Sequence, residues 1–147
     1  MIGMYTVILA LTFAEPSHLA VIQAAPEFAL TTQAGTRLRS ADLKGKVLLV
    51  SFIFTTCNGT CPATTATLAR VQRALRDARL WGEDVAFVSI SIDPTRDTPE
   101  VLAGYARSFG ADPAAWHFLT GPPERVARVI AAWGMWAKVG RVQPKAS

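Results

Sequence analysis

The stretch that decides the fold runs from Val47 to Pro62 and reads VLLVSFIFTTCNGTCP. Its first eight residues, 47–54, are nearly continuous in apolar side chains, which is typical of a β-strand covered on both faces. Two cysteines, Cys57 and Cys61, follow in a short polar loop. Pro62 stands where a helix can begin, because proline is tolerated in the first helical turn. The stretch therefore predicts a buried strand, a cysteine loop and a helix in direct succession.

Further strands are predicted on both sides of this stretch. Residues 27–30 and 36–39 flank a turn signal, and the pattern predicts a hairpin that turns on Gly35. Residues 85–92 (VAFVSISI) form a second nearly continuous apolar run, which again predicts a buried strand. Residues 116–119 predict a short further strand.

Three helices are predicted between and after these strands. Thr98-Pro99-Glu100 starts the second helix with a capping residue, a proline and an acid in the first turn. Gly110 and Gly134 are placed to end the second and third helices. Strands that alternate with helices predict a mostly parallel sheet and the α/β fold class. The predicted apolar faces contain Leu68, Val71, Leu75 and Ala78, then Val101, Leu102, Tyr105 and Phe109, then Val126, Val129, Ile130 and Trp133.

The composition fits one globular domain. A chain of 147 residues has room for one hydrophobic core, and 50% apolar with 18% charged residues excludes a disordered chain, a coiled coil and a collagen-like repeat. The formal net charge is +4, without a block of like charges. Nucleic acid is therefore not expected as a partner. The arginines of the first predicted helix are expected to form a solvated face, and they are Arg70, Arg73, Arg76 and Arg79.

The N-terminal segment allows two interpretations. Tyr5–Phe13 (YTVILALTF) is apolar but shorter than the roughly 20 residues that span a bilayer. It resembles the apolar core of a secretory leader, although no lysine or arginine precedes Arg37. Its β-branched residues equally favour an extra strand. The expected organisation is a leader or extra strand at 1–25, a folded domain at 26–136 and a tail at 137–147.

Cys57 and Cys61 are the predicted chemical centre. The unpaired backbone N–H groups and the dipole at a helix start stabilise a thiolate. Asn58-Gly59 allows the loop to fold back, which would bring both sulfurs to one point. Two such thiolates can close a disulfide or hold a soft ion such as Cu(I), whereas zinc would want four ligands. Spacing alone leaves redox chemistry and copper binding open, beside an inert disulfide or two small core residues.

Three segments carry a family resemblance: FIFTTCNGTCP at 52–62, VSISIDPTRDTPEVLAGYARSFG at 88–110, and WHFLTG at 116–121. Together they resemble the Sco (SenC) family of copper-handling proteins, from about Phe28 to Met135. The resemblance implies a thioredoxin-like three-layer domain with an N-terminal hairpin. It also implies membrane association and a place in the periplasm or on the outer face of the inner membrane. The family delivers copper to the binuclear site of cytochrome c oxidase, and some relatives reduce or exchange disulfides there.

The resemblance assigns roles residue by residue. Cys57 and Cys61 take the positions of the two copper-ligating, redox-active cysteines, with Cu(I) as the favoured ion and Cu(II) as the second. The implied partner is the copper-bearing oxidase subunit or another copper or thiol carrier. Asp93 matches an acidic residue thought to influence the site, but it can equally cap a turn after its strand. Asp97, or the neighbouring Thr98, is predicted to cap the following helix.

One family feature has no match in this chain. The third copper ligand of the family is a histidine in a strand well after WHFLTG, and the thirteen residues that follow Gly134 contain none. The resemblance therefore predicts a truncated or diverged member without the last strands, and the segment Tyr5–Phe13 is a candidate to fill the vacated sheet edge. His18 and His117 are expected to be ordinary histidines rather than replacement ligands.

Three hypotheses for function follow. The first is a Sco-like copper-binding protein that uses Cys57 and Cys61 to deliver copper to the oxidase or to maintain its thiols. The second is a thioredoxin-like thiol–disulfide oxidoreductase without a copper role, with Cys57 as the attacking cysteine. The third is an incomplete gene product without activity of its own.

Overall fold

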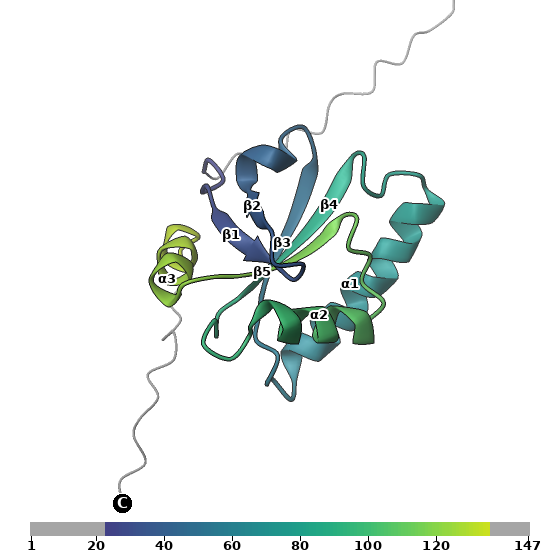
Figure 1. The fold of residues 1–147 in the computed structure, drawn as a ribbon. Helices are drawn as coiled ribbons and strands as arrows, with labels where there is room; N and C mark the ends of the chain where they lie inside the picture. The colour runs from purple at the N-terminus through teal and green to yellow at the C-terminus, as the bar shows by residue number, and fades with distance from the viewer. Residues whose placement is uncertain (1–22, 136–147) are drawn as a thin grey trace, which may run out of the picture.

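The computed structural model describes residues 23–135, and they form one five-stranded sheet with helices on both faces (Figure 1). The strand order is β2-β1-β5-β4-β3. In Figure 1, α1 and α2 lie on one side of the sheet and α3 on the other, so the domain has three layers. The α/β prediction is confirmed. The elements are β1 (Ala29–Thr32), β2 (Arg37–Arg39), the 3₁₀ helix η1 (Ser40–Leu43), β3 (Val47–Ile53), α1 (Thr60–Asp77), β4 (Val85–Ser91), α2 (Pro99–Ser108), β5 (Trp116–Thr120) and α3 (Pro123–Ala132).

Strands β3, β4 and β5 are parallel, and this arrangement places the cysteine loop. The register pairs Ile53, the last residue of β3, with Ser91, the last residue of β4. The carboxyl ends of parallel strands meet at one edge of the sheet, where α/β proteins commonly build their sites. The cysteine loop after β3 and the loop that begins at Ile92 therefore leave the sheet side by side.

The predicted hairpin is confirmed. β1 pairs antiparallel with β2, and Gly35 in the connecting turn has a φ of +76°, a conformation that favours glycine. The hydroxyl groups of Thr32 and Thr36 lie 2.8 Å apart and close the turn. β1 also pairs antiparallel with β5, which joins the hairpin to the parallel part of the sheet.

β4 lies between β5 and β3, and its buried side chains contribute to both halves of the core. Because side chains alternate across a strand, Phe87 packs towards α1 and α2 while Val88 and Ile90 pack towards α3. All three are at most 1% exposed. The prediction of a strand covered on both faces is confirmed for β4.

The same prediction was wrong in part for β3. The strand forms, but Val47 is 69% exposed and Leu48, Leu49 and Val50 are only half-buried. Within residues 23–135, β3 pairs with β4 alone and lies at the edge of the sheet. A continuous apolar run indicates that other elements pack on both faces of a strand, but it does not indicate whether the strand lies inside the sheet or at its edge.

The buried faces of α1 and α2 differ in part from the predicted apolar faces. In α1, Leu68 is buried as predicted, but Val71 and Ala78 are exposed, and Gln72 is 2% exposed in their place. In α2, Val101 is 43% exposed instead of buried. The arginines of α1 are exposed as predicted. The predicted faces of α2 and α3 otherwise hold, with Leu102, Val126, Val129 and Ile130 buried and Tyr105, Phe109 and Trp133 half-buried.

Several predictions fall outside the described residues. These are the interpretations of Tyr5–Phe13, of His18 and of the tail at 137–147. Within residues 23–135, no helix combines the length and apolar character needed to cross a membrane.

Candidate metal and redox site

Cys57 and Cys61 lie at the junction of β3 and α1. The Cys57 N–H donates to the Phe54 carbonyl at 3.2 Å, which closes a turn directly after the strand. α1 begins at Thr60, two residues earlier than predicted, because Gly59 already takes the capping position and a proline in the first turn needs no N–H partner. Cys61 is therefore in the first turn of the helix. Both thiols are free and half-buried.

The two thiols face one another and are electrostatically different. The pKa of the Cys57 thiol is lowered, first by a hydrogen bond from the Cys61 backbone, then by the Gly59 backbone and the Cys61 thiol. The pKa of the Cys61 thiol is raised, first by burial and further by its neighbour Cys57. The backbone groups of a helix start thus stabilise a thiolate on Cys57. The predicted convergence of the two side chains is confirmed.

Tyr105 supports Cys61 from the neighbouring helix α2. The Thr65 hydroxyl donates to the Cys61 carbonyl at 2.8 Å, and the Tyr105 hydroxyl lies 3.0 Å from Thr65 Oγ1. Because the Thr65 proton is already used, Tyr105 is the donor of the second bond. Burial raises the pKa of Tyr105, and the neighbouring thiols add to that rise. The sequence indicated Tyr105 only as an apolar-face residue, since nothing in its spacing reports where the hydroxyl points.

Asp93 forms local contacts in its own turn. Its carboxylate accepts from the Thr95 hydroxyl at 2.9 Å and lies 3.7 Å from Arg96 Nε. Its backbone N–H donates to Ser91 Oγ at 3.0 Å. These contacts support the turn-capping interpretation, and an influence of Asp93 on the cysteines stays a prediction.

The predicted helix cap is Thr98, and the prediction was wrong for Asp97. Thr98 caps the helix by accepting from the Val101 N–H at 3.4 Å. Asp97 is fully buried, and its carboxylate accepts hydrogen bonds from Thr55 and Ser91. Thr55 lies 42 positions away in the sequence, so the residues around Asp97 gave no signal of this role.

The structure places His117 away from the cysteines. It lies in β5 between Trp116 and Phe118, which face α1 and α2, so its side chain is on the opposite face of the sheet. Burial lowers the pKa of His117. Among residues 23–135, no three His, Cys, Asp or Glu side chains gather in a group that could hold a metal ion. The donors offered in this part of the chain are the two thiols.

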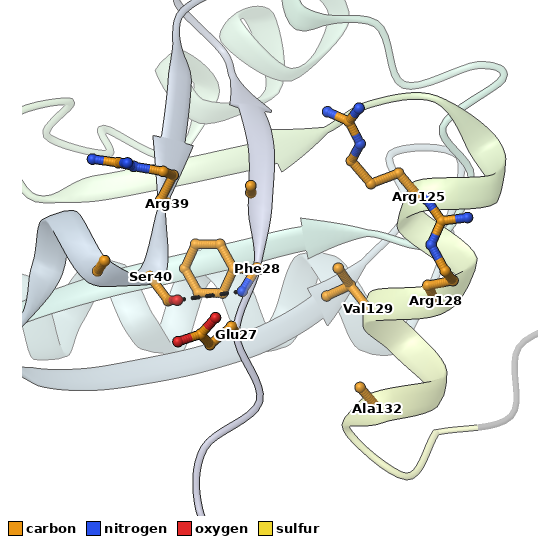
Figure 2. A pocket seen from close by; sticks show the side chains of 10 residues that line it. Glu27, Phe28, Arg39, Ser40, Arg125, Arg128, Val129 and Ala132 are labelled. Carbon is orange, nitrogen blue, oxygen red and sulfur yellow. Dashed lines mark hydrogen bonds between the residues drawn. The ribbon is translucent and has the colours of Figure 1, made fainter.

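Two pockets lie on the face of the sheet that α3 covers, and neither is lined by a cysteine. The first, of about 560 Å³, is shown in Figure 2 between the β1–β2 hairpin and α3. Arg125 and Arg128 line it from α3, and Arg39 lines it from the hairpin, with its guanidinium directed away from α3 and bonded to Asp42. The second, of about 570 Å³, has a largely apolar lining that includes Leu48, Val50 and Trp133.

Comparison with known proteins identifies the family. The family model described as SCO1/SenC matches residues 18–146. The chain belongs to the SCO1/SenC family. The SCO1 protein homolog of Bacillus subtilis is 36% identical over 94 residues, covering 64% of this chain and 47% of that protein. The mitochondrial SCO1 homolog of Homo sapiens is 34% identical over 113 residues, covering 77% and 36%. The chain thus spans about half the length of these relatives or less.

Solved structures of family members have the same fold. Bradyrhizobium japonicum ScoI with copper bound is 34% identical with a TM-score of 0.70, covering 84% of this chain and 74% of that one. BsSco, described as a member of the Sco family of cytochrome c oxidase assembly proteins with a disulfide switch, is 28% identical with a TM-score of 0.69, covering 84% and 71%. A SCO1/SenC family lipoprotein from Bacillus anthracis is 37% identical with a TM-score of 0.66, covering 73% and 62%. The predicted thioredoxin-like, Sco-type fold is confirmed.

Proposed function

We propose that this chain is a Sco-type copper-binding protein in which Cys57 and Cys61 together hold Cu(I) for the assembly of cytochrome c oxidase. The observation that carries the proposal is the meeting of two free thiols at one strand-to-helix turn. A solved relative of the same fold has copper bound, which supports the same cargo here.

The donor set favours Cu(I) over Cu(II). Thiolates are soft ligands that select Cu(I), and Cu(II) prefers a planar set that includes nitrogen. His117 lies on the far face of the sheet and supplies no such nitrogen. Copper binding displaces the thiol protons, and the lowered pKa of Cys57 makes the loss of the proton from this thiol easier.

A second candidate function is thiol–disulfide exchange, favoured by the pKa difference between the two cysteines. The Cys57 thiolate would attack a disulfide of the target, forming a mixed disulfide and releasing one target thiolate. Cys61, after losing its proton, would then attack Cys57, closing a Cys57–Cys61 disulfide and releasing the second target thiolate. The disulfide switch ascribed to the relative BsSco supports the ability of this fold to cycle between the two states.

The partner and the location are parts of the same proposal. The proposed partner is the copper-bearing subunit of cytochrome c oxidase or another copper or thiol carrier, as the description of BsSco as an assembly protein supports. The proposed location is the outer face of the bacterial inner membrane or the periplasm. The lipoprotein relative from Bacillus anthracis supports an attachment to the membrane.

A Cu(I) competition titration of the fully reduced chain tests the proposal. The expected result is one tightly held copper per chain, lost in both Cys57→Ser and Cys61→Ser. Met135→Leu is the matched control, because it removes an exposed soft sulfur shortly after α3, and α3 lies on the face of the sheet opposite α1. Weak or non-stoichiometric binding by the reduced chain would exclude the copper role and leave thiol–disulfide exchange as the candidate.

A further inference from the structure

Asp97 is the centre of a buried hydrogen-bond network at the start of the cysteine loop. Its side chain is 0% exposed. The carboxylate accepts from the Thr55 N–H at 3.2 Å, from the Thr55 hydroxyl and from the Ser91 hydroxyl. Ser91 Oγ in turn accepts from the Asp93 N–H at 3.0 Å. The network thus joins the ends of β3 and β4 at the edge of the sheet where the cysteines lie.

The peptide group between Phe54 and Thr55 connects this network to Cys57. Its N–H donates to Asp97, and its carbonyl accepts the Cys57 N–H at 3.2 Å. The Phe54 N–H belongs to the preceding peptide group, and its hydrogen bond to the Cys61 thiol offsets part of the rise in that thiol's pKa. One short backbone segment is therefore held by Asp97 on one side and holds both cysteines on the other.

We propose that Asp97 is a positioning residue of the cysteine pair, which fixes the backbone of Phe54 and Thr55 and through it the separation and orientation of Cys57 and Cys61. For copper, this inference rests on the proposed function above. For the closing and opening of a Cys57–Cys61 disulfide, it does not.

The negative charge of Asp97 makes it a stronger hydrogen-bond acceptor for Thr55 than a neutral side chain would be. A buried carboxylate is costly unless hydrogen bonds compensate it, and here three donors do so. A hydrogen bond from the Thr55 N–H to a carboxylate polarises the same peptide group, which strengthens its carbonyl as an acceptor. The Cys57 N–H is the group that this carbonyl accepts. Asp97 therefore stabilises the turn that carries Cys57 without touching either sulfur.

The test uses Asp97→Ala, Asp97→Asn and a matched control, Gln72→Ala. Gln72 is also buried and polar, and it hydrogen-bonds the Gly110 carbonyl and the Asp112 N–H near the far end of α1. Two quantities are measured on the folded full-length chains: the Cu(I) association constant, and the equilibrium of the Cys57–Cys61 dithiol with glutathione. Removing a group that orients metal ligands commonly lowers affinity by about 10- to 100-fold, and this loss is expected for Asp97→Ala.

The variants are expected to rank by how many acceptors they keep. An amide oxygen in Asp97→Asn can still accept from Thr55, so this variant should fall between the wild type and Asp97→Ala in both measurements. Gln72→Ala should leave both measurements unchanged although it destabilises the fold. Equal losses in Gln72→Ala and Asp97→Ala, or unchanged values in both Asp97 variants, would overturn the inference.

The experiment also decides in two further cases: a variant that does not fold, and a wild-type chain that binds no copper. If Asp97→Ala does not fold, Asp97→Asn and the Ser91→Ala variant carry the same comparison, because each removes part of the network. If the wild type itself binds no copper, the proposed copper role fails, and the glutathione equilibrium alone decides whether Asp97 positions the pair. A shift of that equilibrium in Asp97→Asn but not in Gln72→Ala supports the inference in that case as well.

Discussion

Replacing Gln72 by alanine should destabilise the fold strongly, although the sequence pattern places this residue among the polar ones of α1. Gln72 is 2% exposed, and its amide donates to the Gly110 carbonyl at 3.0 Å and accepts from the Asp112 N–H at 2.8 Å. These two bonds tie α1 to the loop that follows α2.

The magnitude follows from the groups that lose their partners. A typical hydrogen bond contributes about 0.5–1.5 kcal/mol net, and a buried group left without a partner costs about 1–3 kcal/mol. The truncated side chain also leaves space inside a packed core. We expect Gln72→Ala to lower the free energy of unfolding by about 2–4 kcal/mol.

Urea unfolding followed by circular dichroism measures this change. The expected result is a lower midpoint with an unchanged dependence on urea. Arg73→Ala is the matched control on the next position of α1, where the side chain is exposed, and it should change stability by less than about 0.5 kcal/mol. A loss below about 0.5 kcal/mol in Gln72→Ala, or an equal loss in Arg73→Ala, would refute the reasoning.

Three more predictions concern the site and its surroundings. Near neutral pH, the lowered pKa of Cys57 gives this thiol a larger thiolate fraction than Cys61 has. In variants that keep only one cysteine, alkylation should therefore be faster at Cys57, and its rate should fall as the pH falls through that pKa. Equal alkylation rates at the two cysteines would contradict this. His117→Gln should leave the Cu(I) association constant unchanged in the competition titration, because the side chain is on the opposite face of the sheet from α1. Gly134→Ala should lower the free energy of unfolding by about 1–2 kcal/mol, because the residue has a φ of +71°. The added methyl group meets no atom within 4 Å, so the whole cost is backbone strain. An unchanged urea midpoint would count against this prediction.

The features that sequence predicted well are those encoded by neighbouring residues. The apolar run of β4, the turn on Gly35 and the capping of α2 by Thr98 each depend on a few adjacent side chains, and the structure has all three. The meeting of Cys57 and Cys61 belongs to the same class, because a short loop and a helix start bring them together.

The features that sequence missed depend on contacts between distant residues. Asp97 has the chemistry of a helix cap, yet its carboxylate bonds Thr55, which is 42 positions away. Gln72 interrupts the apolar face of α1 because its partners lie 38 and 40 positions further along. A polar side chain can be buried wherever its hydrogen bonds are satisfied, and a hydropathy pattern does not contain that information.

The most direct test of the central claim is X-ray absorption at the copper edge of the Cu(I)-loaded full chain. The proposed site predicts coordination by two sulfur atoms with one copper per chain, and loss of that signal in both Cys57→Ser and Cys61→Ser. Coordination dominated by nitrogen or oxygen would contradict a Cys57–Cys61 copper site, and so would two-sulfur coordination that persists in either variant.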